Sequence, residues 1–279
     1  LVQYADDSQF IFIGEIKTLP QLITRAEATL TKAKKYFDLN GLQINPQKTQ
    51  IIFIGTQQYI SKIPDDTFIN FDGNQLTPSK HVKNLGIIMD QHLTFSGQVD
   101  YMYKKVIGKL MYINRIKDQF DKQTRINVVE ALILSQINYC ISVWGATNKT
   151  QLQRVQKLQN FAARVAEGTA GKFDHISPVL EELSWLRIND QYKFSLCCLV
   201  WKTLHGMYPD WFLKFPKVSE MNDSITRQAN NLYVKPARLT TGKKILETCG
   251  PILWNSLPLS IRNVNSLPNF KSKLKNYFL

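Results

Sequence analysis

The chain has 279 residues, of which 44% are hydrophobic, enough for one large domain or two ordinary ones. No apolar run reaches the length that spans a bilayer and no signal peptide opens the sequence, so a membrane protein is not predicted. The four cysteines include an adjacent pair and lack histidines at metal-ligand spacing, so we expect no disulfide framework and an intracellular setting.

The net charge of +13 is distributed unevenly along the chain. Residues 1–100 hold 9 Lys and Arg against 10 Asp and Glu, whereas residues 101–279 hold 26 against 12, a net charge of +14. Two stretches are especially basic, 101–165 with 11 against 3 and 227–279 with 9 against 1. A solvated surface would explain the excess of positive charge. A second half that binds polyanions, most commonly nucleic acid, would also explain why the excess lies only after residue 100.

The first hundred residues predict a mixture of strands and one long helix. Two short strands, 1–5 and 8–14, flank an acidic turn, and a helix follows from Thr18 to Asn40-Gly41. Further strands are expected at 49–55 and 82–90, and a hairpin at 67–77 with Asp72-Gly73 as its turn.

From about Ser96 the pattern becomes helical. Three apolar stripes at helical spacing, each opposite a face rich in Lys, Arg and Gln, predict a small bundle with a basic exterior. Helices are also expected at 179–185, 189–204 and in the final "LPNFKSKLKNYFL", with a polar loop near 217–237. The predicted fold class is therefore α+β. The stripes are Met102, Val106, Leu110 and Ile113; Ile126, Val129, Ile133 and Ile137; and Leu152, Val155, Leu158, Phe161 and Ala162.

The acidic turn is the strongest chemical signal in the chain. Asp6 and Asp7 are adjacent like charges at a tight turn, an arrangement that a bound divalent cation such as Mg²⁺ would stabilise. Asp is also favoured in ordinary hairpin turns, and that reading stays open at this point.

Segments in order along nearly the whole chain resemble the C-terminal part of a reverse transcriptase from LINE-type, non-LTR retrotransposons of the jockey-like superfamily. "QYADDSQFIF" resembles the Y-x-D-D box of the palm, "LNGLQINPQKTQIIFIG" the palm motif that follows, and "VKNLGIIMDQHLTF" the primer grip. "INYCISVWGATNKTQLQRVQKLQNFAARV" is similar to the helical thumb region. "LHGMYPDWF" and the stretch with "GPILWNSLP" are similar to the end of such polyproteins.

The resemblance implies a partial palm at 1–95, a helical thumb at 96–170 and a helical C-terminal region at 171–279. It implies that Asp6 is a ligand of catalytic Mg²⁺ and that Asp7 stands close to the metals. Lys48 would help pyrophosphate leave, Tyr4 would lie under the primer end and the incoming nucleotide, and Leu85 and Gly86 would lie on the strand that holds the primer terminus. Each of these roles has an equally open structural alternative. Lys48 would then be a solvated residue beside a strand, and Leu85 and Gly86 would be an ordinary strand residue and a bulge.

The sequence departs from the family in one respect. A third carboxylate and the fingers precede the box in the family, whereas three residues precede Tyr4 here. We therefore expect a fragment that is inactive alone, because two-metal transfer to a primer 3′-hydroxyl needs the missing carboxylate. The partners implied are an RNA template, a DNA primer and the absent fingers, palm and endonuclease segments.

The basic helices fit a thumb that binds the backbone of a template–primer duplex, although the same side chains could simply keep the protein soluble. Trp144, Trp185, Trp201 and Trp254 are expected in the core rather than stacked on bases, and Cys197-Cys198 is expected to pack on an apolar helix. The candidate contacts to nucleic acid are Lys104, Lys105, Lys109, Arg115, Lys117 and Arg125.

Three functions remain. The first is part of an RNA-directed DNA polymerase, which the resemblance places in the nucleus and cytoplasm as a retrotransposon ribonucleoprotein. The second is a non-catalytic nucleic-acid-binding fragment, or a domesticated thumb and C-terminal module. The third is a helical protein-interaction tail with a partner at the C-terminal helix.

Overall fold

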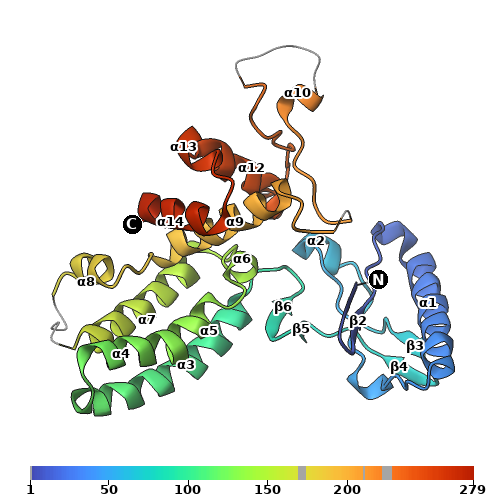
Figure 1. Ribbon diagram of the computed structural model, residues 1–279. Coiled ribbons are helices and arrows are strands. Elements are labelled where there is room, and N and C mark those ends of the chain that lie inside the picture. Colours follow the sequence, from blue (N-terminus) through green and yellow to red (C-terminus); the bar gives the residue numbers. More distant parts are fainter. Residues whose placement is uncertain (1, 169–173, 210, 222–227) are drawn as a thin grey trace. The chain divides into compact units, whose positions relative to one another are not determined.

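The computed structural model describes residues 2–168, 174–209, 211–221 and 228–279. The chain forms two compact units, Leu1–Leu93 and Thr94–Leu279. The first unit combines short strands with helices and the second is helical, so the predicted α+β class is confirmed in its coarse form (Figure 1). Assignment of these parts to a palm and a thumb stays a prediction.

The first unit is built from three separate antiparallel hairpins and one long helix. Its strands are β1 (Val2–Tyr4), β2 (Asp7–Gln9), β3 (Ile69–Phe71), β4 (Asn74–Leu76), β5 (His81–Asn84) and β6 (Ile87–Asp90). Its helices are η1 (Ile16–Thr18), α1 (Leu19–Leu39), η2 (Pro46–Lys48) and α2 (Gln57–Ile60).

The long helix and one hairpin of this unit match the expectations. Helix α1 begins after Thr18 and ends at Asn40, and Gly41 takes the left-handed conformation with φ of 73°. Thr18 does not cap the helix with its side chain, because its hydroxyl donates to the carbonyl of Glu15 instead. Asp72 and Gly73 both have positive φ in the β3–β4 turn, as a type I′ hairpin requires.

Three strand predictions in this unit differ from the structure. The expected strand 8–14 is β2, which ends at Gln9, so residues 10–14 are irregular. The expected strand 82–90 belongs to the hairpin β5–β6, because Leu85 and Gly86 form a tight turn with φ of 44° and 84°. The expected strand 49–55 is irregular, since its hydrogen bonds go to two different segments. Ser79 N donates to Ile51 O at 2.8 Å, whereas Gly55 N donates to Gln91 O at 2.9 Å. An apolar run without one continuous partner strand forms no ladder.

The second unit begins with the predicted helical bundle. Helices α3 and α4 both pack against α7, and the three apolar stripes face inward, with Val106, Leu110 and Val155 fully buried. The helices of this region are α3 (Ser96–Ile116), η3 (Lys117–Gln119), α4 (Lys122–Val129), the π-helical segment η4 (Glu130–Leu134), α5 (Ser135–Asn138), α6 (Ile141–Trp144) and α7 (Lys149–Glu167).

The rest of this unit packs around α9. Helices α12 and α14 lie against it, and the predicted helices at 179–185, 189–204 and the C-terminus are all present with shifted ends. The elements are α8 (Ile176–Glu182), α9 (Ile188–Leu204), α10 (Val218–Met221), α11 (Thr240–Lys244), α12 (Leu246–Ser256), α13 (Leu259–Arg262) and α14 (Leu267–Phe278).

The core around α9 is aromatic. The ring of Phe270 lies 5.8 Å from the rings of both Trp201 and Trp254. Trp144, Trp185, Trp201 and Trp254 are all buried, which confirms their predicted place in the core. Cys197 and Cys198 are buried as expected, and burial raises the pKa of their thiols to about 12 and about 11.

The polar segment predicted as a loop contains some regular structure. Helix α10 occupies one turn of it, and Lys217 forms an isolated antiparallel bridge with Leu232. Its residues 222–227 lie outside the described part of the chain. Within the described ranges, we find no helix with the length and apolarity needed to cross a bilayer.

Candidate nucleic-acid interface

The acidic turn forms the tip of the hairpin β1–β2. Tyr4 pairs with Asp7, which leaves Ala5 and Asp6 as the two residues of the loop. Ala5 has φ of 52°, a left-handed conformation that costs an L-residue roughly 1–2 kcal/mol. Tyr4 is 68% exposed, and Asp6 and Asp7 are both exposed. The turn therefore holds two carboxylates side by side at the surface.

Two exposed carboxylates do not complete a two-metal site. Among the described residues, no group of three or more His, Cys, Asp or Glu side chains is positioned to hold a metal ion. Lys48 is the exposed last residue of η2, and in the described chain it forms no ion pair with Asp6 or Asp7. The residues present thus fit one part of a Mg²⁺ site, and its remaining ligands would have to come from elsewhere.

The acidic hairpin and the hairpin β5–β6 are joined within the first unit. Gln9 on β2 donates from its side-chain amide to Oδ1 of Asn84 at 2.6 Å, across 75 positions of sequence. Leu85 and Gly86 follow Asn84 directly and form the tip of their hairpin, with Leu85 exposed. The predicted primer-grip residues and the Y-x-D-D hairpin are thereby linked, through a contact that no local pattern reveals.

A polar and aromatic face of α3 carries most of the predicted nucleic-acid contacts. Seven residues recur on this face at helical spacing, and we call them the α3 surface: Tyr101, Lys104, Lys105, Gly108, Lys109, Tyr112 and Arg115. All of them are exposed. The four cations among them form no ion pair with any carboxylate in the described part of the chain. The ammonium of Lys105 lies over the Tyr101 ring, 6.0 Å from its centroid. Cations without carboxylate partners, interleaved with tyrosine rings, suit a nucleic-acid backbone.

Tyr101, Gly108 and Tyr112 belong to this surface but were not among the predicted contacts. Gly108 is the one of the three that an exposed helix disfavours. It lies in the middle of an exposed helix, where glycine costs roughly 0.5–1 kcal/mol relative to alanine. A Cβ built on it would meet nothing within 4 Å, so packing inside the chain does not require glycine here. The missing side chain leaves room at this point of the helix for the close approach of another backbone.

Lys117 and Arg125, the other two predicted contacts, are used inside the bundle. The Arg125 guanidinium donates to the carbonyls of Phe120, Ala166 and Glu167 at 2.7, 3.3 and 2.9 Å. Lys117 donates to the carbonyl of Gly168 at 3.4 Å. Both cations therefore satisfy carbonyls at the C-terminal end of α7, where positive charge is favourable.

Comparison with known proteins gives a partial and distant similarity. The chain is 21% identical, over 113 residues, to the RNA-directed DNA polymerase from mobile element jockey of Drosophila funebris. The matched region covers 39% of this chain and 12% of that protein, so the chain spans a small part of its relative. No protein-family model and no solved structure matches the chain. The similarity supports a relationship to reverse transcriptases.

Proposed function

We propose that this chain is part of a retrotransposon RNA-directed DNA polymerase, in which it binds the template–primer duplex and contributes the acidic hairpin. The α3 surface carries the proposal, because it presents unpaired cations, two tyrosine rings and an unexplained glycine on one helix. The distant similarity to the jockey polymerase makes an RNA template and a DNA primer the expected ligands.

In the whole protein, Asp6 and Asp7 would hold Mg²⁺, which would stabilise the attacking and leaving oxygens of nucleotidyl transfer. With two exposed carboxylates and no third one placed beside them in the described residues, we expect no synthesis by this chain alone. Primer extension on an RNA template with Mg²⁺ and deoxynucleotides tests this. Robust incorporation that Asp6→Asn abolishes would contradict it.

Binding is tested by titrating a labelled template–primer duplex at several salt concentrations. The logarithm of the affinity should fall linearly with the logarithm of salt, by roughly 0.9 for each phosphate neutralised. Lys105→Gln should weaken binding and lower this slope by about 1. Lys157→Gln, the same charge change at an exposed position on α7, is the matched control. Equal losses from both variants, or an affinity that salt does not change, would contradict the proposal.

A non-catalytic nucleic-acid-binding module would use the same α3 surface, and primer extension by a chain that includes the upstream polymerase segments separates the two functions. The third alternative, a protein-interaction tail, finds less support. The apolar side chains Phe270 and Leu274 of α14 are fully buried in the core around α9, so this helix already has a partner in its own chain.

A further inference from the structure

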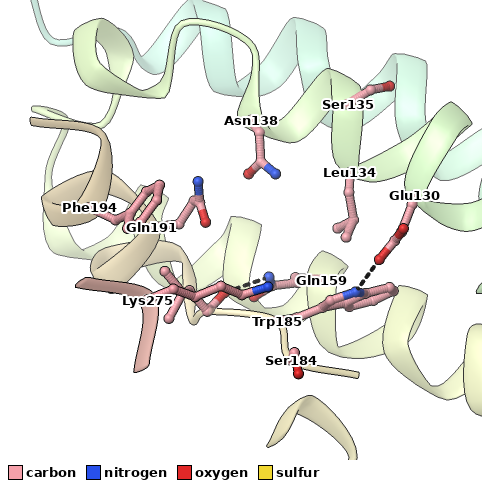
Figure 2. Close-up of a pocket in the computed structure, with 11 residues that line it drawn as sticks. Glu130, Leu134, Ser135, Asn138, Gln159, Ser184, Trp185, Gln191, Phe194 and Lys275 are labelled. Carbon is pink, nitrogen blue, oxygen red and sulfur yellow. Dashed lines mark hydrogen bonds between the residues drawn. The ribbon is translucent and has the colours of Figure 1, made fainter. Parts of the chain in front are cut away.

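The second unit contains a cavity of about 420 Å³ at some distance in sequence from the α3 surface. Figure 2 shows side chains of η4 and α5 pointing into it from one side, opposite Trp185 and Lys275. Its lining residues are Glu130, Leu134, Ser135, Asn138, Gln159, Ser184, Trp185, Leu186, Gln191, Phe194 and Lys275. We call it the Trp185 cavity. Its volume lies within the usual range of sites for small ligands.

Two backbone irregularities border the Trp185 cavity. The π-helical segment η4 interrupts the helix that would otherwise run from α4 into α5, and Ser184 has φ of 54°. Trp185 Nε1 donates to Glu130 Oε1 at 2.8 Å, which joins the two irregular segments. Such departures from regular backbone cost free energy and cluster at functional sites. Here the two irregular segments carry Glu130 and Trp185, which are hydrogen-bonded to each other at the edge of the cavity.

The polar groups of the cavity are incompletely satisfied. Asn138 points into it, and its buried Oδ1 accepts no hydrogen bond, which is costly unless a ligand or water supplies a donor. Gln159, in contrast, is held by Leu186 O and by Gln156, so it is a fixed part of the wall. The half-buried Lys275 ammonium pairs with no carboxylate among the described residues. The amides of Asn138 and Gln191 and the ammonium of Lys275 are therefore left for a ligand.

We propose that the Trp185 cavity binds an adenine nucleotide, with the base between Asn138 and the aromatic side chains and the phosphate at Lys275. Side-chain amides of Asn and Gln pair with the donor and acceptor edge of adenine, and Asn138 and Gln191 are the amides that remain available. Trp185 and Phe194 provide the apolar aromatic wall on which a planar base packs. Ammonium groups of lysine bind phosphate. The proposal does not depend on the α3 surface.

The nucleotide has two sources, a free mononucleotide or an unpaired nucleotide of a bound strand. Titration calorimetry of the full chain with adenosine monophosphate, and separately with a short single-stranded oligoadenylate, distinguishes them. Binding of both ligands indicates a mononucleotide site, and binding of the oligonucleotide alone indicates a base taken from a strand. Cytidine monophosphate should bind more weakly than its adenine counterpart, because its single ring packs less area against Trp185 and Phe194. If neither adenosine monophosphate nor the oligoadenylate binds, the proposal is overturned.

The substitution Asn138→Leu should weaken ligand binding without lowering the stability of the fold. It removes the amide but keeps the side-chain size, and because it also removes an unsatisfied buried acceptor, thermal stability should not fall. Affinity for the adenine ligand should fall about tenfold. Lys275→Gln should weaken the binding of adenosine monophosphate but leave the binding of adenosine, which has no phosphate, unchanged. Unaltered adenine affinity in Asn138→Leu would overturn the proposal. If Lys105→Gln alone weakens the oligonucleotide, the α3 surface stands and the cavity proposal fails.

Discussion

The two units of this chain differ in how they are stabilised. The first unit buries five apolar side chains among its described residues, namely Ala26, Ile69, Phe71, Val82 and Ile87. It also leaves large apolar side chains in solvent, with Ile13 87% and Leu39 77% exposed. The other buried apolar side chains of the described chain all belong to the second unit. Hairpin turns can therefore define strands without supplying a hydrophobic core.

This difference bears directly on the three candidate sites. The acidic hairpin belongs to the unit with the small core, whereas the α3 surface and the Trp185 cavity belong to the unit with the large one. We therefore expect the acidic hairpin to be less stable than the helical surfaces, because its unit buries few apolar side chains.

Separating the units should have the largest effect. A fragment of residues 94–279 should unfold cooperatively on heating, because it contains most of the buried apolar side chains of the described chain. A fragment of residues 1–93 should show no cooperative transition, since its buried apolar area is too small to offset the loss of conformational entropy. Calorimetry and amide hydrogen exchange of both fragments provide the measurement.

Binding of a dye specific for exposed apolar surface gives an independent readout of the same difference. It should be strong for the 1–93 fragment and weak for the 94–279 fragment. A 1–93 fragment that melts sharply and protects its β5–β6 amides would show that local hydrogen bonds suffice, and the contrast between the units would be lost.

Replacing Arg125 tests the stability of the second unit at one side chain. Arg125→Met removes three charge-assisted hydrogen bonds, two to carbonyls at the end of α7 and one to the carbonyl of Phe120, and should lower the stability of the second unit by about 2 kcal/mol. The half-buried carbonyls are left with fewer donors, which adds to the loss. Denaturant unfolding followed by circular dichroism measures the change.

Lys105→Met is the matched control for Arg125→Met. It removes one exposed cation of the α3 surface, so stability should change by less than about 0.5 kcal/mol while duplex affinity falls. Stability losses of equal size in the two variants would mean that Arg125 is not a structural cation. An equal loss of duplex affinity in a stably folded Arg125→Met protein would show that Arg125 contacts nucleic acid.

Gly108→Ala should move stability and binding in opposite directions. Alanine is favoured over glycine in an exposed helix and its Cβ meets nothing here, so stability should rise by roughly 0.5–1 kcal/mol. Duplex affinity should nevertheless fall, because the added methyl group keeps the partner's backbone from α3. Unchanged affinity would mean that this glycine has no role in binding.

The sequence predicted most of the second unit because its signals are local and repeated. Stripes such as Val106 and Leu110 at helical spacing determine both the helix and its buried face. The strand prediction failed at 49–55, because an apolar run becomes a strand only where another segment pairs with it along its length. The Gln9–Asn84 contact and the Trp185 cavity join residues far apart in sequence, so no pattern in one segment predicts them.

The Y-x-D-D hairpin was predicted, but the conformation of Ala5 was not, since alanine is not a residue that favours positive φ. Ala5→Gly should relieve this strain, although glycine also gains freedom in the unfolded chain, so the net stabilisation should be about 0.5 kcal/mol. Amide exchange of Asp6 and Asp7 measures it locally. Asp72→Gly, at the positive φ of the β3–β4 turn, is the matched control in the same unit. If Ala5→Gly slows exchange in its own hairpin and lowers polymerase activity of a longer protein, the strained turn positions Asp6. If exchange is slowed and activity is unchanged, the strain is incidental to the acidic site.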